Sequence, residues 1–321
     1  METYRLVAIS LLSAACCAAQ TEDGPTARLL MGIAVSAQES GDLPRAEKLN
    51  REALAAFAAQ GASDGRDGLR CLVNLGVVLS MEGKFADSEQ IDRIALAKLR
   101  AQPLSEDYAA ALNGLGNALA KRGRAKEAAE AFRQAIAIWE RLLGSNHPNL
   151  ASSLMNLGSL LAAEHRYGEA EALMDRALAI DARNFSADHT RIAIDLNDEA
   201  GLLLDRKQWA EAERLLLRAA SILEQSALLS NGRPSNATLG EVWANLGEVY
   251  RRERRLEESR DYFERGIKIL DLQWGSTDPR LLVWLGNYAS VLRSFEEYTE
   301  AGKLELQATR IRVIEARRRA G

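Results

Sequence analysis

The sequence predicts an all-α protein made of about seven tandem helical hairpins stacked as a solenoid. Three small residues recur seven times, with the second always 12 residues after the first and the third 7 residues after the second. Most sets begin 42 residues after the previous one, with one step of 40 and one of 47. A fixed period of roughly 20 to 50 residues is typical of repeat architectures, in which each repeat packs on its neighbours. The sets are Ala34/Ala46/Ala53, Gly76/Ser88/Ala95, Gly116/Ala128/Ala135, Gly158/Ala170/Ala177, Ala200/Ala212/Ala219, Gly247/Ser259/Gly266 and Ala289/Ala301/Ala308.

Apolar residues recur at steps of three and four within the repeats, which is the pattern of an amphipathic helix. In the fourth repeat, Leu154, Leu157 and Leu161 share one face of a first helix. Leu173 and Leu178 share one face of a second helix. None of the six prolines falls in the middle of a predicted helix, where it would remove a hydrogen bond and clash with the preceding turn.

Residues 1–19 are typical of a secretory signal peptide. Arg5 precedes an uncharged stretch of small and apolar residues, Leu6 to Ala19, and Cys17-Ala18-Ala19 suits cleavage before Gln20. The stretch is shorter than the roughly 20 apolar residues that a membrane span needs. The sequence therefore predicts a periplasmic or secreted protein.

Two alternatives to cleavage stay open at this end of the chain. Ser13-Ala14-Ala15-Cys16 is faintly similar to a bacterial lipobox, which would make the protein a lipoprotein through Cys16. If the segment is instead retained as a first helix, the protein would be cytoplasmic.

Residues 20–321 are predicted to form the solenoid, with repeats over about 27–316. The residue four positions before the first small residue is large and apolar in every repeat, and it is predicted to fill the space between the two helices of a hairpin. The small residues let the helix axes approach closely, so a large side chain there would overpack the contact. The large residues are Leu30, Leu72, Leu112, Leu154, Leu196, Trp243 and Leu285.

Short turns separate the predicted helices. Inside the hairpins the turn is Gly83-Lys84, Gly123-Arg124 or His165-Arg166, and glycine suits the left-handed residue that ends a helix. Between hairpins, Asn146-His147-Pro148 and Ser276-Thr277-Asp278-Pro279 combine a capping residue with a proline in the first helical turn.

Further helix boundaries are less regular. We expect Ser105 and Asp188 to cap helices, and Ser226–Ala237 to form an extended loop that accounts for the 47-residue step. Arg317, Arg318 and Arg319 form the one basic cluster. We expect them at the end of the last helix, where the macrodipole favours cations, with a docking tail as the alternative.

The fourth repeat carries the phrases Asn156-Leu157-Gly158, Tyr167-Gly168-Glu169-Ala170-Glu171 and Arg176-Ala177-Leu178. With the small-residue sets, these phrases resemble the tetratricopeptide repeat, and the longer period resembles its kinesin-light-chain subtype. The resemblance implies a right-handed α-solenoid whose first helices line a concave face that binds peptides or partner proteins. The fifth repeat departs most, with Asp198-Glu199-Ala200 in place of Asn-Leu-Gly. HEAT and armadillo repeats share the period range but do not require the small-residue sets.

Asparagines recur near the same place on the first helix in six of the seven repeats. Because an amide side chain carries both donors and an acceptor, a ladder of them suits the backbone of an extended peptide. The alternatives are hydrogen bonds to the neighbouring repeat, or no specific role. The candidate residues are Asn74, Asn113, Asn117, Asn156, Asn197, Asn245 and Asn287.

Basic residues project near the same face in this register, and they would favour acidic groups of a peptide. The alternative is ordinary surface charge, and Glu241 and Glu248 keep the face from being uniformly basic. A clamp for a C-terminal carboxylate, as some relatives have, is not supported, because Asn113 stands where its lysine would be. The basic residues are Arg70, Lys121, Arg251 and Arg293.

Composition and motifs bound the function further. The net charge of -4 and pI of about 5.7 argue against a nucleic-acid partner or an anionic membrane surface, and no integral membrane span is predicted. Cys71 is expected to be a small buried hydrophobe. The three histidines all fall in predicted turns, and no metal-ligand spacing, phosphate loop or nucleophile motif occurs. The sequence therefore predicts no cofactor, no metal and no enzyme activity.

These observations predict a non-enzymatic protein–protein interaction module that holds a protein or an extended peptide in the concave face of the solenoid. The alternative is a structural or assembly scaffold of the cell envelope that uses the edges or ends of the array. In that case, exposed apolar surface would gather at the terminal repeats.

Overall fold

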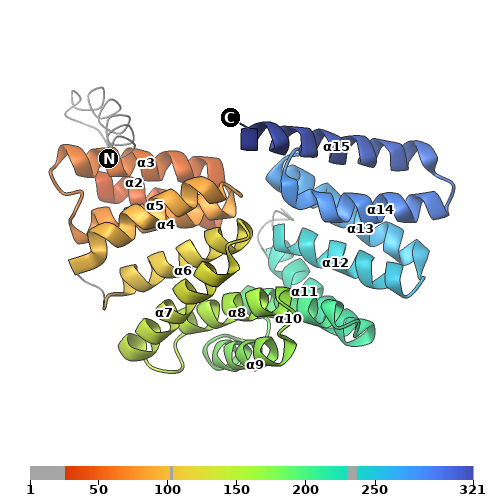
Figure 1. Ribbon diagram of the computed structural model, residues 1–321, viewed down its shortest axis with the longest axis horizontal. Coiled ribbons are helices and arrows are strands. Elements are labelled where there is room, and N and C mark those ends of the chain that lie inside the picture. The colour runs from red at the N-terminus through yellow and green to blue at the C-terminus, as the bar shows by residue number, and fades with distance from the viewer. Residues whose placement is uncertain (1–25, 102–103, 230–236, 321) are drawn as a thin grey trace. The chain divides into compact units, whose positions relative to one another are not determined.

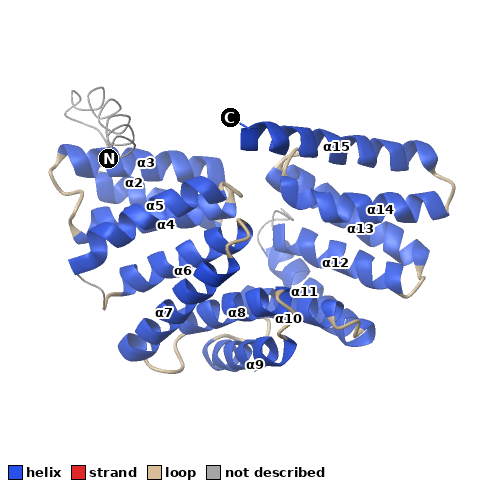
Figure 2. Ribbon diagram, viewed as in Figure 1, coloured by secondary structure: helices blue, strands red, loops and turns tan. Residues whose placement is uncertain are grey.

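The computed structural model describes residues 26–101, 104–229 and 237–320, and every regular element in these ranges is a helix (Figures 1 and 2). The predicted all-α solenoid of tandem hairpins is confirmed, since successive helices pack in pairs along the chain. Two short 3-10 turns, η1 (Leu99–Ala101) and η2 (Pro279–Leu281), join the pairs. The pairs are α2 (Ala27–Glu39) with α3 (Leu43–Ala59), α4 (Arg66–Met81) with α5 (Phe85–Lys98), α6 (Glu106–Lys121) with α7 (Ala125–Leu143), α8 (Pro148–Ala163) with α9 (Tyr167–Asn184), α10 (Thr190–Asp205) with α11 (Trp209–Leu229), α12 (Ala237–Arg252) with α13 (Leu256–Trp274) and α14 (Leu282–Ser294) with α15 (Tyr298–Ala320).

The chain divides into two compact units, which we call unit 1, ending at Asn156, and unit 2, beginning at Leu157. The division falls inside α8, so the first half of that helix belongs to unit 1 and the second half to unit 2. Each unit has its own apolar interior, and the helices of each unit are described separately below. The predicted signal segment, residues 1–19, lies outside the described residues.

The small residues lie where two helices of a hairpin touch, as the sequence predicts. Every member of the seven sets is buried. A Cβ atom added at Gly116 on α6 would lie 2.5 Å from the Phe132 ring on α7. One added at Gly247 on α12 would lie 2.8 Å from the Phe263 ring on α13. The first small residue of these hairpins is therefore glycine because an aromatic ring from the second helix rests on its backbone.

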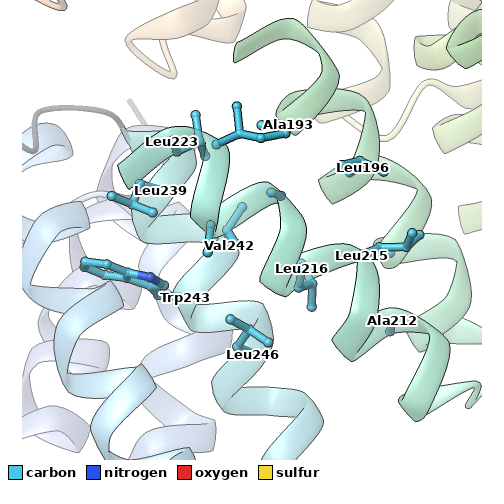
Figure 3. Packing of buried hydrophobic residues seen from close by; sticks show 14 of the residues in the cluster. Ala193, Leu196, Ala212, Leu215, Leu216, Leu223, Leu239, Val242, Trp243 and Leu246 are labelled. Carbon is cyan, nitrogen blue, oxygen red and sulfur yellow. The ribbon is translucent and has the colours of Figure 1, made fainter. Parts of the chain in front are cut away.

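The large apolar residues four positions earlier fill the hairpin interiors. All seven are buried. Figure 3 shows part of this packing in unit 2, where Leu239, Val242 and Trp243 on α12 lie beside Leu216 and Leu223 on α11. These residues come from adjacent hairpins, so the same interior holds each hairpin together and joins it to the next.

Each of the seven hairpins closes through a residue in the left-handed backbone region. Gly41, Gly83 and Gly123 take this position in unit 1, and His165, Lys207, Arg254 and Glu296 take it in unit 2 with φ of 60–61°. The next backbone N–H then donates to a carbonyl five residues earlier, as from Arg166 to Leu161 at 2.9 Å and from Gln208 to Leu203 at 2.9 Å. This is the Schellman arrangement that ends a helix, and it is the same in every hairpin.

The predicted helix starts are mostly confirmed. The Ser105 hydroxyl accepts a hydrogen bond from the backbone N–H of Tyr108 and caps α6. His147 Nδ1 accepts from the N–H of Asn149 at the start of α8. Helix α15 extends through Ala320, so residues 317–319 lie in its last turn.

Two local predictions are wrong. Asp188 does not cap α10, because the helix begins one residue later than expected and His189 Nδ1 accepts from the N–H of Arg191 at 3.1 Å instead. The Ser226–Ala237 segment is not a loop throughout, because α11 continues to Leu229 and α12 already begins at Ala237. The intervening residues, 230–236, lie outside the described part of the chain.

Candidate functional site

The seven predicted asparagines all lie on first helices of hairpins, and each is partly exposed. A helical position fixes which face a side chain occupies, so equivalent positions on successive first helices place these amides along one face of each unit. Two open cavities are lined by some of these asparagines and not by others, so each cavity is described in turn.

In unit 1, an open cavity of about 260 Å³ lies between α4, α6 and the first half of α8. We call it the unit 1 groove. Asn113 and Asn117 on α6 line it, and no residue of its lining is charged. The full lining is Val77, Ser80, Met81, Ala110, Asn113, Gly114, Asn117, Trp139, Asn149 and Ser152.

Asn113 is also bonded to the next first helix. Its Oδ1 accepts from Asn156 Nδ2 at 3.1 Å and from the Ser153 hydroxyl at 3.0 Å, and both donors lie on α8. The oxygen of this amide is therefore used between repeats, while its Nδ2 has no partner among the described residues. Asn156 does not line the groove.

In unit 2, a larger open cavity of about 590 Å³ follows the first helices from the second half of α8 to α14. We call it the unit 2 groove. Three predicted asparagines, Asn197, Asn245 and Asn287, line it. Asn245 Nδ2 donates to Asn197 Oδ1 at 3.0 Å, which repeats the bond between α8 and α6 in unit 1. The full lining is Ser159, Ala162, Ala163, Met174, Asn197, Asp198, Gly201, Leu202, Leu204, Asp205, Trp209, Asn245, Glu248, Arg252, Val283, Trp284 and Asn287.

The asparagines thus lie in grooves and also bond between repeats. Five of the seven line a groove, and two pairs are hydrogen-bonded from one first helix to the next. Asn74 on α4 lines neither groove.

The predicted basic residues are mostly ion-paired. Arg70 Nε lies 3.2 Å from Asp107 Oδ1, and Arg293 contacts Glu305 of α15 at 2.9 Å. Arg251 makes two bonds of 2.8 Å to the Glu248 carboxylate, which raises the pKa of the guanidinium. Lys121 is exposed at the end of α6. None of these four cations lines either groove.

Sequence reasoning missed several residues of the unit 2 groove. Trp209, at the start of α11, and Trp284, on α14, form apolar walls, and Val283 beside Trp284 is 65% exposed. Asp205 is exposed at the end of α10, and desolvation by the surrounding protein raises the pKa of its carboxyl group, an effect that the nearby His165 only partly offsets. The signal that could have found them is the scarcity of aromatic residues, since only 6% of the chain is Phe, Trp or Tyr.

Other reactive groups lie away from the grooves. Cys71 is buried on α4 as predicted, and burial raises the pKa of its thiol to about 12, so the thiolate that reacts or binds metals is disfavoured. Among the described residues, no group of three or more His, Cys, Asp and Glu side chains is close enough to hold a metal ion. No described helix is both long and apolar enough to cross a membrane.

The comparisons with known proteins agree with this architecture. The family model of the tetratricopeptide repeat matches residues 107–181, 150–225 and 238–312, which together make up more than half of the chain. A curated relative, the kinesin light chain-related protein 2 of Arabidopsis thaliana, is 33% identical over 115 residues, which are 35% of this chain and 17% of the plant protein. The chain therefore spans less than a fifth of that relative.

Two solved structures share the fold at low sequence identity. The apo form of RapI matches with a TM-score of 0.59 and 16% identity, over 84% of this chain and 93% of RapI. A Rap protein complexed with competence and sporulation factor matches with a TM-score of 0.57 and 15% identity, over 91% of this chain and 98% of that protein.

Proposed function

Because the chain belongs to the tetratricopeptide repeat family, with repeats of the kinesin-light-chain-like subtype, we propose that it is a non-enzymatic module that binds an extended segment of a partner protein. Proteins of this family bind proteins or peptides. The segment would lie in the grooves that the first helices line, with asparagine amides bonded to its backbone. We place this function outside the cytoplasm, in the periplasm or as a secreted protein, and we propose neither nucleic acid nor a cofactor as a ligand.

The observation that carries the proposal is that five candidate asparagines line the two grooves. Their amides are partly exposed, so a guest backbone can reach them. The bonds between Asn156 and Asn113, and between Asn245 and Asn197, hold the amides in place before a partner arrives. Preorganised groups lose less conformational entropy on binding.

A display library of random peptides, selected against the full chain, tests the proposal. We expect enriched peptides whose binding is weakened about tenfold or more in an Asn113→Ala/Asn197→Ala/Asn245→Ala variant. The matched control replaces three amides on second helices, Gln90→Ala/Gln134→Ala/Asn184→Ala, and leaves binding unchanged. No enrichment, or equal loss in both variants, would contradict the proposal.

The location requires its own measurement. If residues 1–19 are removed during export, the measured mass of the mature protein equals that of a chain beginning at Gln20. The protein then appears in the periplasmic or secreted fraction of its native cell. A lipid on Cys16 would add a fixed mass and move the chain to the membrane fraction. An intact N-terminus in the cytoplasmic fraction would contradict export.

A second candidate function, the assembly scaffold, is favoured by one observation. The most exposed large apolar side chains, Leu272, Leu306, Val283, Tyr298 and Leu29, lie in the first or the last two hairpins. Exposed apolar surface of this kind marks interaction sites on soluble proteins. Val283 also lines the unit 2 groove, but contacts through the other four residues would use neither groove.

A further inference from the structure

Helix α15, the last helix in Figure 1, carries a regular row of exposed side chains. The row is spaced alternately by three and four residues, so its members lie along one face of the helix. With a rise of about 1.5 Å per residue, the row extends for about 21 Å. We call it the α15 stripe, and it consists of Lys303, Leu306, Arg310, Val313 and Arg317.

The α15 stripe is not the face by which hairpins stack on one another. On α13, Leu270 and Trp274 belong to the apolar cluster that joins this helix to α14. The residues 42 positions later, Arg312 and Ala316, lie outside the stripe. The equivalents of the stripe itself on α13 include no large apolar residue, so the stripe is not a general feature of second helices. These equivalents are Asp261, Glu264, Lys268, Asp271 and Gly275.

The stripe is basic, and two of its three cations are uncompensated. Arg310 and Arg317 have no ion-pair partner among the described residues, whereas Lys303 Nζ lies 2.7 Å from Glu300 Oε1. That pair is exposed, so it holds Lys303 only weakly. The nearby Glu305 is occupied by Arg293 at 2.9 Å. The stripe is therefore a locally basic surface on a chain whose net charge is -4.

The alternation of three and four residues is the spacing of positions a and d in a coiled-coil heptad. In this register the cations occupy the a positions, and Leu306 and Val313 occupy the d positions. Apolar d residues pack between side chains of a facing helix, and charged a residues select the side chains opposite them. Two copies of the stripe would bring like charges into one seam. A helix with carboxylates along its seam would instead supply the missing counter-charge.

A helix also suits the stripe better than a membrane or a nucleic acid does. A helix that lies on a bilayer buries a broad apolar face in the lipid, whereas here two apolar residues alternate with cations in a single row. Glu300 and Glu305 flank this row on its two sides, and lipid phosphates or a nucleic-acid backbone would repel them. A single row of side chains fits the groove between ridges on another helix.

We propose that the α15 stripe binds an acidic amphipathic helix of a partner protein in the manner of a two-stranded coiled coil. Carboxylates of the partner would lie beside the three cations, and its apolar side chains would pack against Leu306 and Val313. The stripe shares no residue with either groove, so this inference goes beyond the proposed function and does not depend on it.

A display library of helical peptides, about three heptads long and randomised only at the a and d positions, tests the proposal against the full chain. Enriched peptides are synthesised, and fluorescence anisotropy measures their affinity for the protein. One variant, Arg310→Gln/Arg317→Gln, removes the free cations, and a second, Leu306→Ser/Val313→Ser, removes the apolar residues. The control, Arg133→Gln/Arg312→Gln, removes the same charge at two exposed positions outside the stripe. Circular dichroism and the urea midpoint verify that the variants fold alike.

We expect Glu and Asp to be enriched at the a positions of the selected helices, and Leu, Ile and Val at the d positions. Exposed ion pairs are worth up to about fivefold each, so Arg310→Gln/Arg317→Gln should weaken binding about fivefold to tenfold. This effect should shrink at high salt. Loss of the two apolar contacts should weaken binding about tenfold or more. The control, and the Asn113→Ala/Asn197→Ala/Asn245→Ala variant, should bind as the wild type does.

Several results would overturn this inference and leave the proposed function standing. They are enrichment of helices with neutral or basic seams, no enrichment at all, and equal loss of affinity in the control. Binding lost in the triple asparagine variant would place the helix in a groove instead. Vesicles of phosphatidylglycerol that bind through the stripe, when no acidic helix is enriched, would assign it to a membrane surface.

Discussion

At the scale of single residues, the hairpin closures of unit 2 use side chains where glycine is better suited. Lys207 has a φ of 60°, although it lacks the conformational freedom that the absence of a Cβ atom gives glycine, and its side chain is exposed. For residues with a Cβ atom the left-handed region costs about 1–2 kcal/mol, because the Cβ atom crowds the following carbonyl oxygen. The backbone hydrogen bond from Gln208 to Leu203 holds the turn in this conformation.

We therefore expect Lys207→Gly to raise the free energy of unfolding by about 0.5–1 kcal/mol, after the extra entropy of glycine in the unfolded chain is subtracted. The reverse change, Gly123→Ala at the equivalent closure of α6 and α7, should lower it by about 1 kcal/mol. Urea unfolding followed by circular dichroism measures both. A lower midpoint for Lys207→Gly would show that its side chain makes a contact that outweighs the backbone cost.

Two buried carboxyl groups give the protein a pH dependence. Burial raises the pKa of Asp92 on α5 to about 8, against a smaller opposing effect of the Ser88 hydroxyl. Burial, and then the neighbouring Asp181, raise the pKa of Asp195 on α10 to about 8. In both cases the folded chain holds a proton that the unfolded chain releases near pH 4.

The sign of the effect follows from these shifts. A raised pKa stabilises the fold fully below about pH 4, and this contribution is lost as the pH rises toward 8. We expect the free energy of unfolding to fall between pH 5 and pH 8 by more than about 1 kcal/mol. Asp92→Asn should reduce this fall, and Asp87→Asn, exposed on the same helix, should not. Identical pH profiles for the wild type and Asp92→Asn would contradict the assignment.

At the scale of helices, each pair depends on close approach at the small residues. Ala135 on α7 is fully buried, and it is the third member of its set. Ala137, two positions further along α7, is exposed on another face of the helix, so the two faces of one helix can be tested against each other.

Ala135→Leu should overpack the contact and lower the free energy of unfolding by about 1–3 kcal/mol. Ala137→Leu, on the exposed face of the same helix, should change it by less than about 0.5 kcal/mol. Ala170→Leu on α9, with the exposed Ala172→Leu as its control, makes the same comparison in unit 2. The urea midpoint measures all four, and equal midpoints within each pair would refute the register of the repeats.

The sequence predicted the fold well because every hairpin needs small residues at the same positions, where its two helices approach closely. Burial of Ala135 or Gly247 follows from spacing alone, since neighbouring repeats need the same small residue. The helix start near Asp188 did not follow, because aspartate and histidine can both accept a capping hydrogen bond.

The ion pairing of the predicted basic residues could not be predicted in the same way. Whether Arg70 or Arg251 is compensated depends on side chains from another helix or another turn, such as Asp107 and Glu248. Spacing shows which face a residue occupies, but not which rotamer or ion pair it adopts there.

At the scale of the whole molecule, the exposed apolar residues of the last helix distinguish the two candidate functions. Leu306 and Val313 are 71% and 46% exposed, and they lie two turns apart on one face of α15. In a monomer whose partners bind only in the grooves, this face has no assigned role. In a scaffold it would be a contact surface.

The scaffold function predicts that the purified chain self-associates and that Leu306→Ser/Val313→Ser makes it monomeric. Analytical ultracentrifugation over a range of concentrations measures this, and Thr309→Ser/Arg312→Lys on the same helix is the control for unrelated effects. If the wild-type chain stays monomeric at every concentration, self-assembly through this face is contradicted. The proposed binding of a partner segment in the grooves is then the remaining candidate function.

The shared Schellman closure has a consequence for engineering. Because each hairpin ends its first helix by the same local hydrogen bond, its geometry does not depend on the length of the segment that precedes the next hairpin, as the 47-residue step before the sixth set shows. One hairpin is thus an exchangeable cassette. Adding a copy of α12 and α13 after Trp274 should add one asparagine, the copy of Asn245, to the row on the first helices. The binding surface would become longer without a redesign of the other hairpins.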